Sequence, residues 1–278
     1  MIAVWMGALL LQNAAFLAEE LAGNRLTVVN GYAVIEVSIE GRGPFRMMLD
    51  TGAASCSLSP DAAKTAHLAL DHRVVLTTIV GERVVPGASN AHLRIGTSEA
   101  RGVEVLAMEP DAVRAAIGPV DGVLGQSFLS KFPYLIDYRD QRLWLGAAAV
   151  RRALDLPAEI GAERSEGRVV VPVAIGAGVG PWRLTLDSGA TAIVLRCGGR
   201  CPKLRKARSG DRIVTNAGSS ARVRHGMLPA VRVGDKVLEW AEAALIDGPA
   251  STSEDGVLPA NWFSAVFVDP ARSIVRLR

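Results

Sequence analysis

The sequence predicts a mostly β protein made of two related lobes, with a few short helices and a cleft between the lobes. Two observations carry this prediction. Ordered motifs recur about 137 residues apart, and both halves contain alternating apolar runs that end at glycine-rich turns. The 278 residues are enough for two domains of ordinary size. We divide the chain into an N-terminal segment (1–29), a first lobe (30–150), a polar linker (151–168) and a second lobe (169–278).

The repeat consists of three elements in the same order in each half. An apolar strand leads first into Asp50-Thr-Gly-Ala and, in the second half, into Asp187-Ser-Gly-Ala. An Asp-Gly-Val-Leu element begins 71 residues after the first aspartate, at Asp121, and 68 residues after the second, at Asp255. The halves close with apolar segments that contain a further aspartate, at 136–145 and 268–277. Matched spacing of three motifs predicts two halves related by a pseudo-twofold axis.

Alternating side chains predict a β-hairpin before each of the two motif aspartates. In the first half, residues 32–40 alternate between two faces, turn at 41–44 and return over 45–49. Segments 169–175 and 182–186 repeat this arrangement in the second half. Each aspartate therefore lies at the end of an apolar strand.

Short helices are predicted between the strands of the first lobe, at 60–67, 111–117 and 126–132. The first of them has Ser59 as its N-cap and Pro60 at its first helical position. Helices this short leave the lobe mostly β.

The residues after each aspartate predict a tight, rigid turn. Gly52 and Gly189 permit close approach of the backbone. The hydroxyls of Thr51 and Ser188 are placed to form hydrogen bonds that fix the loop. A single Asp-Thr-Gly is more often structural than catalytic, whereas two in matched context indicate a shared site.

A pseudo-twofold axis brings Asp50 and Asp187 face to face. Two adjacent carboxylates cannot both ionise, so one pKa rises and the pair supplies one base and one acid. The base takes a proton from water and the acid protonates a peptide carbonyl. This chemistry uses no cofactor and no metal, and the four histidines and three cysteines form no cluster with metal-ligand spacing.

These motifs resemble the paired signature of aspartic peptidases. Segments 123–125 and 257–259 also resemble the family's second conserved loop, which packs behind the active-site turn. The resemblance covers residues 30–278 and implies a bilobal acid-protease fold, an extended peptide or protein substrate, and Asp50 and Asp187 as catalytic residues.

Among aspartic peptidases, the chain is most similar to bacterial retroviral-like (retropepsin-like) enzymes fused in tandem. The lobes are short, and Ala53 and Ala190 follow the glycines. Pepsin-like members carry a hydroxyl donor there, so its absence predicts higher pKa values for the pair and activity nearer pH 5 to 7 than pH 2. One departure is Pro259, which stands where the family has glycine and removes a backbone donor.

Two glycine-tipped hairpins are further candidates for the site. Segments 78–82 and 215–220 place Gly81 and Gly218 at their tips, one in each lobe. Retroviral-like enzymes cover the substrate with two such flaps, so these hairpins fit the tandem arrangement.

Three functions stay open on the sequence alone. The first is an aspartic endopeptidase. The second is a catalytically weak or inactive peptide-binding protein of the same fold, which Pro259 favours and the intact motifs oppose. The third is a glycosidase, which also uses two carboxylates but usually has aromatic platforms, whereas 5% of this chain is aromatic. Asp121 and Asp255 are interpreted as loop-support residues rather than catalysts.

Composition adds expectations about partners. The net charge is +3, and the basic run at 203–208 lacks interleaved aromatic residues, so we expect no nucleic-acid binding. Because both halves lie in one chain, a monomer is sufficient for the aspartate pair. Cys56 is expected to be a buried small hydrophobe, while Cys197 and Cys201 form either a disulfide or two free thiols. The tryptophans are expected in the core or between the lobes, namely Trp144, Trp182, Trp240 and Trp262.

The N-terminal segment contains an apolar run at 3–18. It resembles the hydrophobic region of a signal peptide, which predicts an exported protein that is periplasmic or anchored to the membrane through this segment. The alternative is an N-terminal amphipathic helix.

Overall fold

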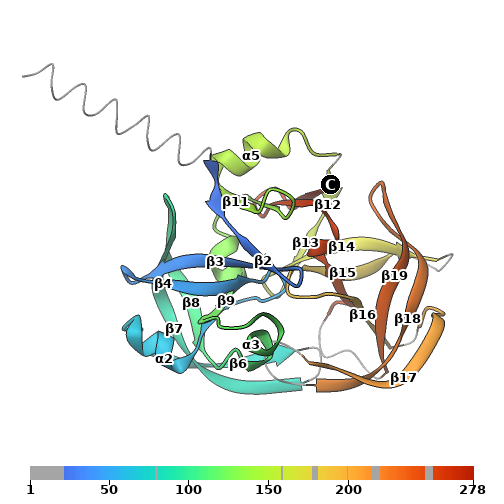
Figure 1. The fold of residues 1–278 in the computed structure, drawn as a ribbon, viewed down its shortest axis with the longest axis horizontal. Coiled ribbons are helices and arrows are strands. Elements are labelled where there is room, and N and C mark those ends of the chain that lie inside the picture. The colour runs from blue at the N-terminus through green and yellow to red at the C-terminus, as the bar shows by residue number, and fades with distance from the viewer. Residues whose placement is uncertain are drawn as a thin grey trace, which may run out of the picture.

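The computed structural model describes residues 22–78, 81–157, 159–176, 181–198, 200–214, 220–247 and 253–278. The apolar run at 3–18 and the flap candidate Gly218 lie outside these ranges. Figure 1 shows two β-rich bodies side by side, with a third layer of strands above them that joins the two. The prediction of a mostly β protein with two lobes is confirmed.

The first lobe is built on an eight-stranded sheet of order β2-β3-β4-β9-β5-β8-β7-β6. Strand β4 pairs with β9 in parallel, as does β5 with β8, and the other neighbours are antiparallel. The strands are β2 (Thr27–Val29), β3 (Tyr32–Ile39), β4 (Arg42–Leu49), β5 (Cys56–Leu58), β6 (His72–Thr78), β7 (Gly81–Ile95), β8 (Ser98–Ala107) and β9 (Gly122–Leu124).

The second lobe has the same strand order, β13-β14-β15-β20-β16-β19-β18-β17. Even the extra pairing of β3 with β7 has its equivalent in the pairing of β14 with β18. The sequence repeat is therefore also a repeat of topology. The strands are β13 (Glu163–Ser165), β14 (Arg168–Ile175), β15 (Trp182–Asp187), β16 (Ile193–Cys197), β17 (Arg205–Val214), β18 (Ser220–Val233), β19 (Lys236–Asp247) and β20 (Gly256–Pro259).

A six-stranded sheet joins the lobes, because β10 of the first half pairs with β21 of the second. Two of the short strands, β12 and β13, lie within the segment that we treated as a linker. The strands of this sheet are β1 (Asn24–Arg25), β11 (Arg142–Leu145), β10 (Tyr134–Asp137), β21 (Ala265–Asp269), β22 (Ile274–Leu277) and β12 (Ile160–Gly161).

Several predicted boundaries are wrong by a few residues. The first hairpin turns at Glu40 and Gly41, both with positive φ (51° and 71°), rather than at 41–44, because a two-residue turn of this kind matches the twist of the strands. Helix α2 (Pro60–Thr65) begins at the Ser59 N-cap, whose hydroxyl accepts a hydrogen bond from the Ala62 N–H. It ends before His67, which has a φ of 57°.

Further helices in the described ranges are α3 (Asp111–Ile117), α4 (Gln126–Leu129), α5 (Ala147–Ala153) and the 3₁₀ turn η1 (Ala260–Trp262). The predicted bounds of α3 are those observed, whereas α4 is shorter than expected and α5 was not predicted. Among the described residues, no helix is long and apolar enough to cross a membrane.

Apolar residues of both lobes form one continuous core, from Leu26 to Leu277. Trp144 and Trp182 are buried, as expected. The expectation for Trp240 is wrong, because its side chain is 56% exposed on β19. The lobes thus share their interior as well as a sheet, which holds the two halves of the cleft in register.

Candidate active site

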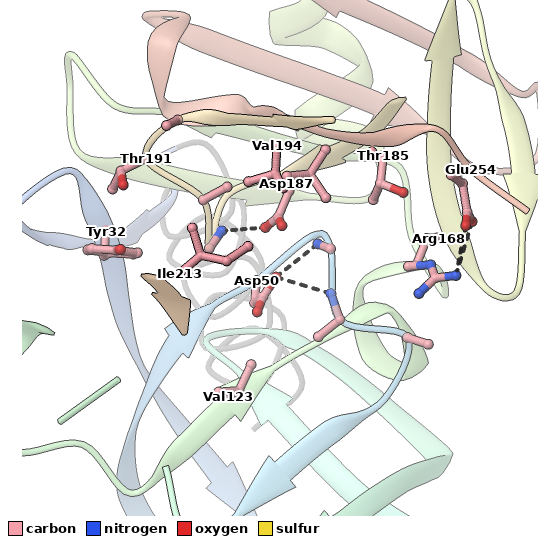
Figure 2. Close-up of a pocket in the computed structure, with 18 of the residues that line it drawn as sticks. Tyr32, Asp50, Val123, Arg168, Thr185, Asp187, Thr191, Val194, Ile213 and Glu254 are labelled. Carbon is pink, nitrogen blue, oxygen red and sulfur yellow. Dashed lines mark hydrogen bonds and ion pairs between the residues drawn. The ribbon is translucent and has the colours of Figure 1, made fainter. Parts of the chain in front are cut away.

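Each motif aspartate lies where two parallel strands end. Asp50 follows β4, and its N–H donates to the Leu124 carbonyl of β9 at 3.0 Å. Asp187 ends β15 and lies opposite Pro259 of β20 in the register. The structure brings these two aspartates together on opposite sides of the lobe interface, as Figure 2 shows.

Four buried hydrogen bonds cross the interface directly behind the aspartates. The Thr51 N–H donates to the Ser188 hydroxyl at 2.9 Å, and the Ser188 N–H donates to the Thr51 hydroxyl at 3.0 Å. The Thr51 hydroxyl donates to the Leu186 carbonyl at 2.6 Å, and the Ser188 hydroxyl donates to the Leu49 carbonyl at 2.8 Å. The hydroxyl that follows each aspartate therefore binds the backbone of the opposite lobe, and the two turns are held against each other.

The two carboxylates receive different backbone support. The N–H groups of Gly52 and Ala53 donate to Asp50 Oδ1 at 2.9 and 3.0 Å. Asp187 Oδ1 accepts from the Gly189 N–H at 2.7 Å. Hydrogen bonds from N–H groups stabilise the ionised form of a carboxylate, so this asymmetry favours the negative charge on Asp50.

The pKa of Asp187 is raised well above its usual range. Desolvation by the surrounding protein is the main cause, followed by the charge of Asp50, and a side-chain hydrogen bond with Asp50 acts in the same direction. Asp50 itself is 3% exposed. The raised pKa makes Asp187 the member of the pair that holds a proton more readily.

Gly52 lies so close to the second lobe that a side chain would not fit. A methyl group at this position would lie 2.7 Å from both carboxylate oxygens of Asp187. Glycine is therefore required for the approach of the first turn to the opposite aspartate.

Asp121 and Asp255 support the two loops in equivalent ways. The Arg46 N–H donates to Asp121 Oδ2 at 2.8 Å, and the Arg183 N–H donates to Asp255 Oδ2, also at 2.8 Å. Both carboxylates thus hold the strand that leads to a motif aspartate, in line with their interpretation as support residues.

Pro259 replaces Gly125 without leaving a hydrogen bond unmade. In the first lobe, the Gly125 N–H donates to Cys56 Sγ at 3.3 Å. In the second lobe, the position equivalent to Cys56 is Ile193, whose side chain accepts no hydrogen bond. A residue without an N–H therefore fits beside it, and Pro259 still pairs in register with Asp187.

The aspartates open into a cavity of about 430 Å³ between the lobes. Leu76 on β6 and Ile213 on β17 line it from equivalent places in the two lobes. These strands belong to the two candidate flaps. The first hairpin pairs up to Thr78 and Gly81, and the second pairs up to Val214 and Ser220.

Sequence reasoning missed several residues that line this cavity, namely Tyr32, Arg168, Thr185, His225, Glu242 and Glu254. It also missed a polar network under the first flap. The Ser55 hydroxyl donates to Glu104, His72 Nε2 lies 3.3 Å from Glu104 Oε1, and His72 Nδ1 lies 2.6 Å from Asp71 Oδ1. The position of Tyr32 and Arg168 in the repeat was the available signal, because each begins the hairpin of its lobe.

Cys197 and Cys201 form a disulfide, which decides between the two alternatives, and Cys56 is buried as expected. Within the described ranges, no three His, Cys, Asp or Glu side chains gather in a way that holds a metal ion.

Comparison with known families bears on this geometry. Residues 35–128 match the family model of the aspartyl proteases. This match supports an aspartyl protease family assignment. It covers the first motif aspartate, its turn and the element at Asp121, while the second lobe shows the same strand order without such a match. No curated protein matches the chain.

Proposed function

We propose that the protein is an aspartic endopeptidase, with Asp50 and Asp187 as its catalytic residues and the two hairpins as flaps over an extended peptide. The observation that carries the proposal is the cross-lobe pair itself. Two carboxylates from equivalent turns face one another, and the pKa of one is raised by burial and by the other's charge.

The mechanism follows from the unequal support of the two carboxylates. Asp50, with two N–H donors, acts as the base that takes a proton from an attacking water molecule. Asp187 donates its proton to the carbonyl oxygen of the peptide, so that a tetrahedral diol forms. Collapse of the diol breaks the C–N bond, and the leaving nitrogen takes a proton from the pair.

The raised pKa of Asp187 supports activity at mildly acidic to neutral pH. The proposed mechanism needs one proton on the pair, and burial keeps that proton bound above the usual range of an aspartate. Ala53 and Ala190 supply no hydroxyl donor that would oppose this shift.

A tandem retroviral-like arrangement is the second part of the proposal. Support comes from the equal strand order of the lobes and from one hairpin over the cavity in each. We also propose that the chain is exported through its apolar N-terminal run, which cell fractionation with and without residues 1–21 tests.

The deciding experiment is cleavage of casein by the full chain between pH 3 and 8. Asp50→Asn and Asp187→Asn should each reduce cleavage by at least about 10³-fold, since removal of one partner of such a unit costs nearly the whole effect. Asp61→Asn, on the exposed face of α2, is the matched control and should keep full activity.

A second candidate function is a peptide-binding protein without turnover. The experiment separates the two, because an inactive wild-type chain that binds extended peptides in the cavity would replace the peptidase proposal with this one. Pro259, which favoured that candidate on the sequence, is accommodated beside Ile193 and no longer does so.

A further inference from the structure

The two ends of the cleft are formed by equivalent positions with opposite chemistry. Val34 pairs with Met48, two residues before Asp50, and Val170 pairs with Thr185, two residues before Asp187. Counting back along each strand makes Tyr32, the first residue of β3, equivalent to Arg168, the first residue of β14. Figure 2 shows Tyr32 and Arg168 on opposite sides of the aspartates.

Two further pairs of equivalent positions are apolar in the first lobe and polar in the second. Met48 of the first lobe corresponds to Thr185 of the second, and Val120, before Asp121, corresponds to Glu254, before Asp255. The first lobe thus has tyrosine, methionine and valine where the second has arginine, threonine and glutamate.

Helix α3 explains the apolar character of the first set. Its residues Val113 and Ile117 pack with Met48 and Val120, and Tyr32 lies against this cluster. The first lobe has fourteen residues between β8 and β9 (108–121), whereas the second has eight between β19 and β20 (248–255). In the second lobe, Arg168, Thr185 and Glu254 line the cavity directly.

Together with the neighbouring Glu166, the polar set carries an excess of negative charge. Arg168 Nη2 donates to both oxygens of Glu254, at 3.0 and 3.1 Å, and to Glu166 at 2.6 Å. Glu254 is 4% exposed. One guanidinium between two carboxylates leaves one negative charge at this end of the cleft, and Glu242 adds another to the cavity wall.

This charge distribution discriminates among substrate side chains. A third carboxylate beside Glu166 and Glu254 would be repelled, since like charges in a partly desolvated site interact strongly. An apolar side chain would bury charged groups without pairing them. A lysine or arginine side chain is attracted by the excess negative charge and supplies N–H donors to it.

We propose that Arg168, Thr185 and Glu254, together with the neighbouring Glu166, form a polar subsite that selects a basic substrate residue on the second-lobe side of the scissile bond. The Tyr32 side accepts an apolar residue instead. This inference rests on the proposed function, because it concerns the substrate of the same cleft. The two ends of the cleft would then accept different substrate side chains, although the two lobes have the same strand order.

The test exchanges the charged residues at this end of the cleft for their first-lobe counterparts, which for Glu166 is Asn30. The triple variant Glu166→Asn, Arg168→Tyr, Glu254→Val removes the one positive and the two negative charges, and with them the negative excess. Peptides that differ only in one residue (Lys, Leu or Glu) at each position are measured for binding to the Asp50→Asn chain, and for cleavage by the chain with Asp50 intact.

We expect the original cleft to prefer Lys over Leu at one position by about tenfold, which corresponds to about 1.4 kcal/mol. The triple variant should lose this preference. Equal binding of the Lys and Leu peptides by the original cleft, or an unchanged preference in the triple variant, overturns the inference. Selective binding of the Lys peptide without any cleavage contradicts the peptidase proposal alone and leaves the subsite standing.

Glu166→Gln provides a second variant in case the triple variant does not fold. It removes one exposed charge and leaves the buried pair of Arg168 and Glu254 intact. It should lower the Lys preference by about two- to fourfold, the size expected for one partly screened charge. Glu36→Gln, on an exposed position of β3, is the matched control and should leave the preference as it is. Equal effects of the two substitutions would contradict the subsite.

Discussion

The two lobes agree where they meet each other and differ at the two ends of the cavity between them. At their interface, Thr51 and Ser188 make the same pair of hydrogen bonds in opposite directions. At the two ends of the cavity, Tyr32 faces Arg168 across the aspartates. The comparison suggests that the geometry of the aspartate pair tolerates little change, whereas the walls on either side are free to diverge.

The largest expected effect on activity comes from a methyl group added at Gly52, at the interface between the lobes. Gly52→Ala places this group against the Asp187 carboxylate, so the pair must separate. A misplacement of this size costs on the order of 10²-fold in kcat/KM. Gly161→Ala, where a side chain meets no neighbouring atom within 4 Å, is the control and should change kcat/KM little. Full activity of Gly52→Ala would mean that the carboxylates need not lie this close.

Loss of the cross-lobe hydrogen bonds is expected to have the next largest effect, on the stability of the protein. Thr51→Val and Ser188→Ala each leave buried N–H and carbonyl groups unpaired, which costs about 1–3 kcal/mol of unfolding free energy per variant. Urea unfolding of both single variants and the double variant measures the coupling. We expect the double variant to lose less than the sum, because the hydroxyls serve one network. Additive losses would show that the two halves of the interface act independently.

The raised pKa of Asp187 predicts that this residue destabilises the fold at neutral pH. A carboxyl whose pKa is higher in the folded state resists ionisation, so stability falls as pH rises from the ordinary aspartate value towards the raised one. Asp187→Asn removes this penalty. Its Tm should exceed that of the unsubstituted chain at pH 7, by about 2–4 °C for each kcal/mol relieved, and by less at pH 4. Thermal unfolding at the two pH values checks this, and an equal difference at both would refute it.

Exchanging proline and glycine at positions 259 and 125, behind the two turns, should lower the free energy of unfolding by unequal amounts. Pro259→Gly adds chain flexibility and a donor with no sulfur partner, which costs about 1 kcal/mol or less. Gly125→Pro removes the N–H that bonds Cys56 and adds a ring where a side chain has no room, so it should cost about 3 kcal/mol or more. Urea unfolding measures both. Similar losses would contradict the pairing of Pro259 with Ile193.

The smallest expected effect concerns the network under the first flap. Asp71 raises the pKa of His72, with a contribution from Glu104, while the pKa of Asp71 is lowered to about 2, mainly by Ser89 and His72. The ion pair between Asp71 and His72 is therefore fully formed above the ordinary pKa of an aspartate, about 4. It is lost as pH rises through the raised pKa of His72.

Hydrogen exchange of the β6 amides tests this link. Protection should decrease between pH 5.5 and 8, after correction for the intrinsic exchange rate, and His72→Gln should abolish the pH dependence. Lobe two offers an internal control, because Arg208 occupies the position of His72 in β17 and keeps its charge over this range. A pH-dependent change in β17 of the same size would show that His72 is not the cause.

The repeat in the sequence was sufficient to predict the two lobes and to place Asp50 and Asp187 in equivalent turns. Motifs such as Asp-Thr-Gly are local, and their spacing reflects a fixed number of strands between them. The polar subsite was not predictable in this way, because Arg168 and Glu254 are 86 residues apart and are joined by an ion pair. These residues are marked in the sequence only by a difference between the halves, whereas the repeat consists of positions that are alike.

Other misses have local causes. Helix α5 lacks a side-chain N-cap, since Gly146 precedes it, and it therefore has no start signal in the sequence. Trp240 adopts a φ of 55°, and its exposure follows from this irregular position in β19 rather than from its apolar character. The effect of Pro259 depended on Ile193, which lies beside it only once the sheet has formed.

The joining sheet has a consequence for what can enter the cleft. The pairing of β10 with β21, together with the shared core, closes the side of the cleft that carries the aspartates. Under the proposed function, a polypeptide would then enter from the side of the two hairpins, as an extended segment. We therefore expect cleavage of loops, tails and unfolded chains rather than of compact domains.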